Sequence, residues 1–203
     1  MHKVFISYHH KNDQEYKDEL LKFNEKHNLF IDASVDTGEI PGDWDDQKIR
    51  QVIRDDYLKD STVTILLVGT ETKYRKHIDW ELYSSMYDGK INKKSGILVV
   101  HLPSANCSYF TSTHDGEKEA IYPHIKSWTT VAERTTYDER YPYIPERIKD
   151  NLLANDVTIS VVNWSDFTKS INNMNFLIEK TFEDRAKCNY DLSRPMRKRN
   201  HNI

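Results

Sequence analysis

The sequence predicts a doubly wound α/β domain with five mainly parallel strands and helices on both faces of the sheet. Short apolar runs alternate along the chain with segments of helical periodicity. These runs lack the alternation of polar and apolar residues seen in half-exposed strands, as is typical of strands buried on both faces. The length of 203 residues fits one such domain.

Five short apolar runs are the predicted strands. Val63–Val68 (VTILLV) is the most apolar stretch of the chain and is expected at the centre of the sheet. The other four are residues 3–8, 29–33, 96–102 and 157–162. Polar or turn-forming residues bound each run, which favours strands over segments of longer helices.

Helices are predicted between and after these strands. Residues 13–27, 44–58 and 77–89 carry apolar side chains at helical spacing, and a long final helix starts near Ser165. Asn12 is placed to cap the first of these helices. The alternation of strands and helices indicates a flavodoxin-like order, with a parallel sheet covered on both faces.

One long segment, residues 103–144, interrupts the alternation. It is rich in Ser, Thr, Tyr, His and Pro with weak periodicity, and the next helix is expected only over 144–154. Loops this long inside a compact domain are usually functional, as lids or partner surfaces. We therefore predict one domain over 1–187 with an insertion at 103–144, followed by a basic, flexible tail over 188–203.

Composition disfavours several classes of protein. A net charge of −3 does not favour sequence-independent electrostatic binding to nucleic acid. No apolar run reaches the roughly 18 residues of a membrane helix and no signal-peptide pattern precedes the first strand, so we expect a cytoplasmic protein. Cys107 and Cys188 match no metal-ligand spacing, and free thiols without a metal site are expected. Motifs for dinucleotide redox chemistry, ATP hydrolysis and esterases do not occur.

The third predicted helix carries a candidate for a catalytic group, Glu81. On a helical wheel, Ile78, Leu82 and Met86 face the sheet, and Glu81 lies at the margin of that face beside His77. A carboxylate there reaches the carboxyl ends of the strands, where open α/β sheets bind ligands. The alternative is a solvated glutamate in an i,i+4 pair, but histidine and serine stand one turn away. His77 would orient the carboxylate or stack on a base, or is an ordinary surface histidine.

Four more residues are candidates for binding a substrate at this edge. Ser7, Tyr8 and His9 leave the first strand there, where their backbone N–H groups and side chains are placed to hold a ribose or phosphate. Asp36, in the turn-rich loop after the second strand, is placed to accept a hydrogen bond from a ribose hydroxyl. The alternative for all of them is strand termination and turn formation.

An aromatic stripe on the third helix, Trp80, Tyr83 and Tyr87, falls on the face opposite the core. Such a stripe is unusual in water, and exposed apolar patches mark interaction sites. We expect the 103–144 insertion to cover it, or else a second subunit.

Four segments, in this order, resemble the TIR family. They are Phe5-Ile-Ser-Tyr8 with Asp13 at the next helix start, the loop from Asp36 to Gly42, Val63 to Gly69 with Glu81 in the following helix, and Asn163-Trp164. The resemblance spans most of the chain and is closest to the Thoeris-type TIR proteins of antiphage defence. One departure is that many catalytic TIR domains have tryptophan where this chain has His77, whereas Trp80 stands three residues later.

The resemblance implies an enzyme that consumes NAD as a substrate, with Glu81 essential and no cofactor. It also implies a cyclic or conjugated ADP-ribose product that signals to a downstream effector protein, a phage-derived trigger and possible self-assembly into a homo-oligomer. The residues themselves are compatible with this reaction. Nicotinamide leaves as a neutral molecule from a cationic precursor, so a single carboxylate is enough, unlike in ordinary glycoside hydrolysis.

Two other functions remain open from the sequence. One is a TIR-type interaction module without catalysis, which would use the Pro41-Gly42 loop and the aromatic stripe for assembly. The other is a nucleoside (deoxy)ribosyltransferase, which also uses a glutamate on a doubly wound sheet. Substitution of Glu81 would spare the module and abolish either enzyme.

Overall fold

The computed structural model describes residues 1–34, 41, 44–90 and 92–200. Within these residues the sheet has five strands in the order β2-β1-β3-β4-β5, and each neighbouring pair is parallel. The strands are β1 (His2–Ser7), β2 (Phe30–Asp32), β3 (Val63–Val68), β4 (Gly96–His101) and β5 (Ser160–Asn163). This is the flavodoxin-like order, so the predicted fold class is confirmed, with a wholly parallel sheet.

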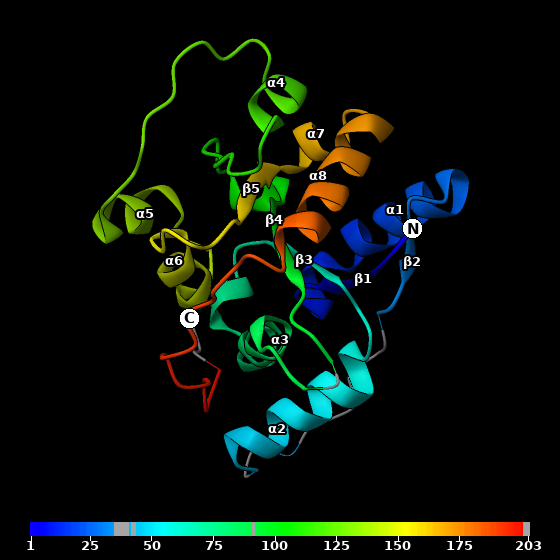
Figure 1. Cartoon of the computed structure of the whole chain (residues 1–203), viewed down its shortest axis with the longest axis vertical. Coiled ribbons are helices and arrows are strands. Elements are labelled where there is room, and N and C mark those ends of the chain that lie inside the picture. The colour runs from blue at the N-terminus through cyan, green and yellow to red at the C-terminus, as the bar shows by residue number, and fades with distance from the viewer. Residues whose placement is uncertain (35–40, 42–43, 91, 201–203) are drawn as a thin grey trace.

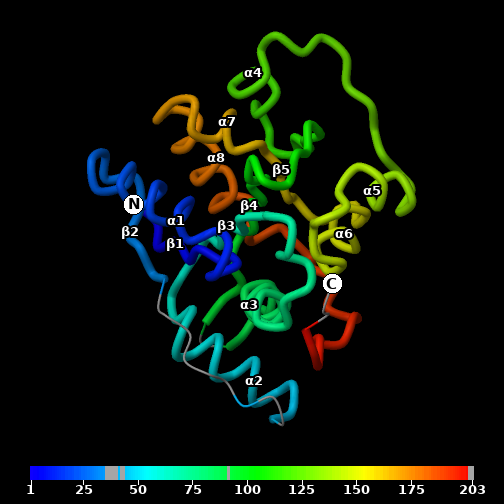
Figure 2. Tube along the Cα trace, turned by 180° about the vertical axis from the view of Figure 1, so that it is seen from behind, coloured from blue at the N-terminus to red at the C-terminus, as the bar shows by residue number. Residues whose placement is uncertain are grey.

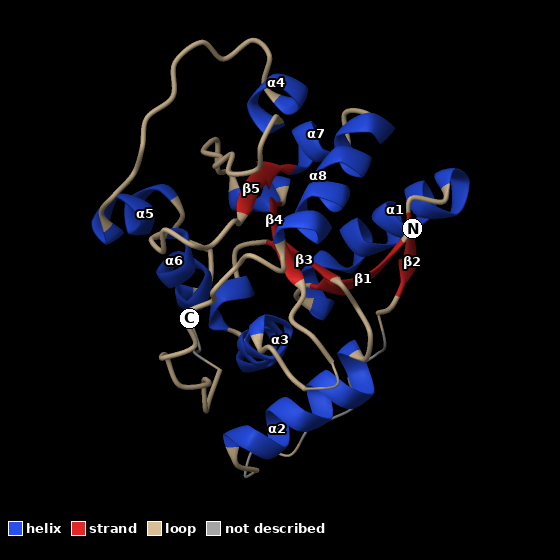
Figure 3. Ribbon diagram, viewed as in Figure 1, coloured by secondary structure: helices blue, strands red, loops and turns tan. Residues whose placement is uncertain are grey.

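Helices cover both faces of the sheet (Figures 1 and 3). One face packs against α1 (His10–His27), α7 (Trp164–Phe167) and α8 (Ile171–Asp184). The other packs against α3 (Lys76–Met86) and α6 (Glu146–Leu152). Outside α3 lie α2 (Asp46–Val52) and the π-helical segment η1 (Ile53–Leu58). The remaining short helices are η2 (Thr72–Tyr74), η3 (Pro103–Ala105), α4 (Glu117–Ile121) and α5 (Arg134–Arg140).

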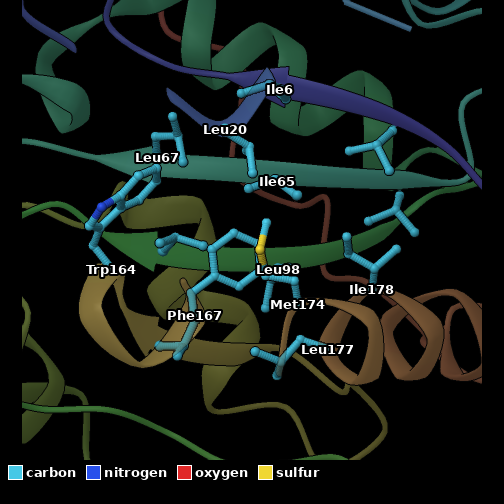
Figure 4. Packing of buried hydrophobic residues seen from close by; sticks show 14 of the residues in the cluster. Ile6, Leu20, Ile65, Leu67, Leu98, Trp164, Phe167, Met174, Leu177 and Ile178 are labelled. Atoms are coloured by element: carbon cyan, nitrogen blue, oxygen red, sulfur yellow. The ribbon is translucent and has the colours of Figure 1, made fainter. Parts of the chain in front are cut away.

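The apolar runs are continuous because both sides of each central strand are buried. In β3, Ile65 and Leu67 face α1 and α8, whereas Leu66 and Val68 face α3. Figure 4 shows the first of these cores, where strand residues meet Leu20 of α1 and side chains of α7 and α8. Burying each such side chain contributes about 1.5–3 kcal/mol to the stability of the fold. The helices packed on both faces therefore fix the positions of the strand ends.

Four predicted boundaries were wrong. The third predicted helix, expected to reach residue 89, ends at Met86. Helix α1 begins at His10 with His9 as its N-cap, so Asn12 lies in the first turn and does not cap the helix. The predicted single final helix is two helices, because the Ser170 Oγ accepts a hydrogen bond from the Asn173 backbone N–H at 3.1 Å and caps α8. Strand β5 begins only at Ser160, where its pairing with β4 starts.

The aromatic stripe on α3 is covered by parts of the chain other than those expected. Trp80 is 1% exposed and belongs to a core with Phe5, residues of α2 and η1, and Met196. Its indole N–H donates to the Arg197 carbonyl oxygen at 2.8 Å. The prediction that the 103–144 insertion or a second subunit covers this stripe was wrong for Trp80, because a helical wheel cannot reveal a second layer outside the first.

The C-terminal segment was expected to be flexible over 188–203, and its described part, residues 188–200, packs along α3 and α6. The buried guanidinium of Arg147 binds both carboxylate oxygens of Asp79 at 3.0 and 3.1 Å and the Arg194 carbonyl oxygen at 2.9 Å. Asp79 also accepts a hydrogen bond from the Arg197 backbone N–H at 2.8 Å. These bonds hold the segment beside the start of α3.

The insertion contains two short helices, α4 and α5, that its weak periodicity did not predict. It is attached to the edge of the sheet by Thr111, which exchanges two backbone hydrogen bonds of 2.9 Å with Val161 of β5. No helix among the described residues combines the length and apolar character needed to cross a lipid bilayer.

Candidate active site

Glu81 of α3 meets the carboxyl end of β1. Ser7, the last residue of β1, donates a hydrogen bond from Oγ to Glu81 Oε2 at 2.6 Å. Ser7 faces α3 because strand residues alternate between the two faces, and Phe5, two positions earlier, packs with Trp80 of the same helix. Two of the predicted site residues are therefore in direct contact.

The carboxylate of Glu81 is buried, with 4% of the residue exposed. Burial raises its pKa from 4.5 to about 7, although the Ser7 hydrogen bond and the positive charge of Lys17 act in the opposite direction. Among the described residues, Ser7 is the one hydrogen-bond donor to this carboxylate. A group with a pKa near neutrality exchanges protons readily at physiological pH, as catalytic carboxylates do.

His9 follows the same strand end and is also buried. Its Nε2 lies 3.8 Å from the carboxylate of Glu71, and its Nδ1 has no hydrogen-bond partner in the described part of the chain. Burial, followed by the positive charges of Arg75 and two neighbouring side chains, lowers the pKa of His9 to about 4. The imidazole is therefore neutral at pH 7, with one ring nitrogen buried and unpartnered within the described residues.

Tyr8 turns toward the opposite face of the sheet from Ser7. Its hydroxyl donates to the side-chain oxygen of Gln14 at 2.6 Å, and its ring stacks on His10 with 4.4 Å between centroids. Lys17 lies over the same ring at 5.1 Å. The side chain of Tyr8 thus belongs to the α1 side, and only its backbone is shared with the edge that holds Ser7.

His77 lies one turn before Glu81 on α3. Its ring packs edge-on against Trp80 with 5.1 Å between centroids. This contact fixes the imidazole at the start of the helix, beside the C-terminal segment. Asp36, the remaining predicted site residue, lies outside the described residues.

Sequence reasoning gave no site role to Asp13, which is a second buried carboxylate at this edge. It is 2% exposed, its Oδ2 has no hydrogen-bond partner among the described residues, and burial raises its pKa to about 6. Asp13 lies against Gly69, the residue after β3, where an added Cβ would come within 2.6 Å of the carboxylate. The glycine directly after the most apolar run was the available signal.

His101, the last residue of β4, was also missed. It is buried, and neither ring nitrogen has a hydrogen-bond partner within the described residues. Burial lowers its pKa to about 4, and its ring packs edge-on against Tyr141 at 5.3 Å. A histidine that ends an apolar strand at the ligand-binding edge was visible in the sequence.

These side chains offer proton exchange and hydrogen bonding at the carboxyl edge of the sheet. No group of three or more His, Cys, Asp or Glu residues in the described ranges is arranged to hold a metal ion. A positive charge bound near Glu81 would favour its ionised form.

Comparison with known proteins places these residues in a family. The family model of the TIR-like domain of the Thoeris protein ThsB matches residues 5–107, just over half of the chain. The matched segment includes β1 from Phe5, all of β3 and β4, and the Ser7–Glu81 pair. No curated protein matches the chain. The chain therefore belongs to the family of Thoeris ThsB TIR-like domains, and is a Thoeris-type defence protein.

Proposed function

We propose that this protein cleaves the bond between nicotinamide and ribose in NAD, with Glu81 as the catalytic residue. The observation that carries the proposal is a buried carboxylate with a pKa of about 7, bonded to Ser7 at the ligand-binding edge of the sheet. Membership of the Thoeris TIR-like family supports the same chemistry.

The ionised form of Glu81 would act in the bond-breaking step. Nicotinamide departs with the bonding electron pair and becomes neutral, which leaves positive charge on the ribose ring. A carboxylate that accepts hydrogen bonds from the ribose hydroxyls stabilises this charge more in the transition state than in the substrate. In a buried site the attraction is stronger than in water, because little solvent screens it.

Glu81 would also take part in the second step. Water, or a nucleophile within the ADP-ribose unit or on an acceptor, attacks the ribose carbon and loses a proton. A carboxylate with a pKa of about 7 is well matched to accept that proton. Hydrolysis then gives ADP-ribose, nicotinamide and a proton, whereas attack by another nucleophile gives a cyclic or conjugated ADP-ribose.

The candidate substrate-binding residues keep their proposed roles around Glu81. Ser7 would orient the carboxylate through its 2.6 Å hydrogen bond. His9, neutral at pH 7, would donate or accept a hydrogen bond, and His77 would face the substrate from the preceding turn. The backbone of Tyr8 and the side chain of Asp36 complete the proposed set.

The product would act as a diffusible signal to a downstream effector protein. The family context of Thoeris defence supports this role, with a phage-derived trigger that activates the enzyme. Assays therefore need both resting and triggered conditions.

The test compares wild-type protein with Glu81→Gln and with Glu25→Gln, a matched substitution at an exposed position on α1. Each is incubated with NAD, with and without lysate from phage-infected cells, and nicotinamide and nucleotide products are measured by mass spectrometry. We expect nicotinamide release from the wild type and Glu25→Gln, and a loss of about 100- to 1,000-fold in Glu81→Gln.

The same experiment separates the alternatives. An interaction module would release no nicotinamide in any condition while remaining folded, which would contradict the proposal. A nucleoside (deoxy)ribosyltransferase would exchange bases on simple nucleosides and would not require the pyrophosphate of NAD.

A further inference from the structure

A cavity of about 780 Å³ lies at the insertion, away from Glu81. One wall is the segment 108–113, and another is part of the chain between α4 and α5, residues 122–133, which we call the arch. Figure 2 shows the arch leaving the body of the protein after α4 and returning at α5. The volume falls within the roughly 300–1,000 Å³ of typical small-molecule sites.

The cavity is separate from the candidate active site. It flanks β5, the edge strand of the sheet, on the side where Thr111 pairs with Val161. Three strand spacings of about 4.8 Å, roughly 14 Å in all, separate β5 from β1 and Ser7. Neither Ser7 nor Glu81 lines the cavity.

The charges that line the cavity are all positive. Lys118 and Arg140 contribute to the lining, and no Asp or Glu from the described part of the chain does. Each cation lies over an aromatic ring, Lys118 over Trp128 at 4.9 Å and Arg140 over Tyr109 at 5.1 Å. Among the described residues, neither Lys118 nor Arg140 forms a salt bridge with a carboxylate, so both remain available to an anion.

Aromatic rings and hydroxyl groups supply the rest of the recognition chemistry. Trp128 meets the stacked rings of Phe110 and Tyr122 edge-on, with 5.7 Å between centroids in each case. Seven Ser and Thr residues also line the cavity, and Ser112 Oγ is buried without a hydrogen-bond partner among the described residues. Aromatic faces beside cations suit a planar ring that carries a negative group.

The backbone of the arch is also available. Within the described residues, no backbone N–H or C=O of residues 126–132 takes part in a hydrogen bond with another backbone group. Most of these residues are exposed, so water bonds their backbone groups in the free protein, and a ligand in the cavity would replace that water.

We propose that this cavity is a second binding site, for a nucleotide: a planar base held against the aromatic wall near Trp128, and a phosphate held by Lys118 and Arg140. The site is independent of NAD cleavage at Glu81, because it uses other residues on another edge of the sheet. An acidic peptide with an aromatic residue shares part of this chemistry, but a nucleotide combines ring, hydroxyl groups and phosphate in one small molecule.

The test is calorimetric titration of the full chain with ADP, adenosine and inorganic phosphate. We expect saturable ADP binding that weakens with salt, and about tenfold or more weaker binding of adenosine and of phosphate. Arg140→Gln and Lys118→Gln should each weaken ADP binding about tenfold, because each removes one charged contact. Lys126→Gln, an exposed neighbour that does not line the cavity, removes the same charge and should leave binding unchanged.

A second variant pair separates this site from the first. Trp128→Leu should weaken ADP binding at the cavity, and Ser7→Ala is measured beside it to reveal any binding at the Glu81 edge. ADP binding that is lost in Ser7→Ala but kept in Arg140→Gln would place the nucleotide at Glu81 and overturn the proposal. The absence of ADP binding by folded protein, or equal binding by Arg140→Gln and wild type, would overturn it as well.

Discussion

Two buried glutamates in this chain have similar surroundings but different bonding. Glu81 accepts a hydrogen bond from Ser7 at the end of β1, and Glu117 accepts one from Ser160 at the start of β5. Glu117 also accepts from the backbone N–H groups of Thr113 and His114 at 3.1 and 3.0 Å. These bonds hold the insertion against the sheet. Glu81, among the described residues, is hydrogen-bonded only to Ser7.

The difference shows how bonding distinguishes a structural carboxylate from a candidate catalytic one. Burial raises the pKa of both groups, and in Glu117 the donors from Ser160, His114 and Thr113 oppose that rise. All three donors bond Oε2 of Glu117, and its Oε1 is buried without a hydrogen-bond partner among the described residues. The two glutamates therefore differ in which segments their bonds hold together, and substitution can test this difference.

The largest expected effect on stability is at Glu117. Glu117→Ala leaves the buried His114 backbone N–H without its acceptor, which costs about 1–3 kcal/mol. It also removes the charged acceptor of the Thr113 N–H and the Ser160 hydroxyl, which keep only their weaker mutual bonds at 3.3 and 3.1 Å. We expect the free energy of unfolding to fall by about 3 kcal/mol or more, as measured by urea titration. An unchanged midpoint would mean that Glu117 does not hold the insertion.

At Glu81 the effect on stability should have the opposite sign at high pH. The folded-state pKa of about 7 exceeds the ordinary value of 4.5. The protonated carboxyl therefore contributes its whole stabilisation below pH 4.5, and this stabilisation is lost as the pH rises through 7. The glutamine side chain of the Glu81→Gln variant cannot ionise, so the variant does not lose this stability. At pH 8 we expect it to be more stable than wild type by up to about 3 kcal/mol, with little difference near pH 5.

The control for this measurement is Glu25→Gln, whose side chain is exposed and should show no such pH dependence. Urea titrations at pH 5 and pH 8 are sufficient. A Glu81→Gln variant that is less stable than wild type at pH 8 would indicate that the carboxylate is ionised and well solvated in the folded protein.

The strands and the position of Glu81 could be predicted from the sequence, because both follow from local patterns. Val63–Val68 was predicted with its observed bounds, since burial on both faces requires a continuous apolar run. Ser7 at the end of β1 and Glu81 in the helix after β3 were both expected at the carboxyl edge of the sheet, although their hydrogen bond was not predicted. Neither inference needs knowledge of distant segments.

The parts that the sequence did not predict depend on contacts between distant segments. Trp80 is buried by Met196 and residues of α2 and η1, which a helical wheel cannot place. Asp13 is a buried carboxylate that lies against Gly69, the residue after β3, which is distant from it in the sequence. The two helices of the insertion are short and depend on tertiary contacts, such as the Glu117 bonds, more than on their own periodicity.

A smaller effect is expected at Ser7. Ser7→Ala removes the one hydrogen bond that favours the ionised form of Glu81, so the pKa of Glu81 should rise further and less carboxylate is present at pH 7. We expect nicotinamide release at pH 7 to fall about tenfold and to recover partly at higher pH. Ser7→Thr, which keeps the hydroxyl, should restore the rate, and a rate unchanged by Ser7→Ala would remove Ser7 from the site.

The most direct test of the proposed mechanism is the pH dependence of nicotinamide release from NAD in single-turnover conditions, measured from about pH 5 to 9. We predict a rate that rises with pH through an apparent pKa of about 7, as Glu81 ionises, and that levels off above it. Glu81→Gln should lose both the activity and this rise. A rate that is flat or falls over the same range, or a rise that persists in Glu81→Gln, would contradict the assignment of Glu81 as the catalytic carboxylate.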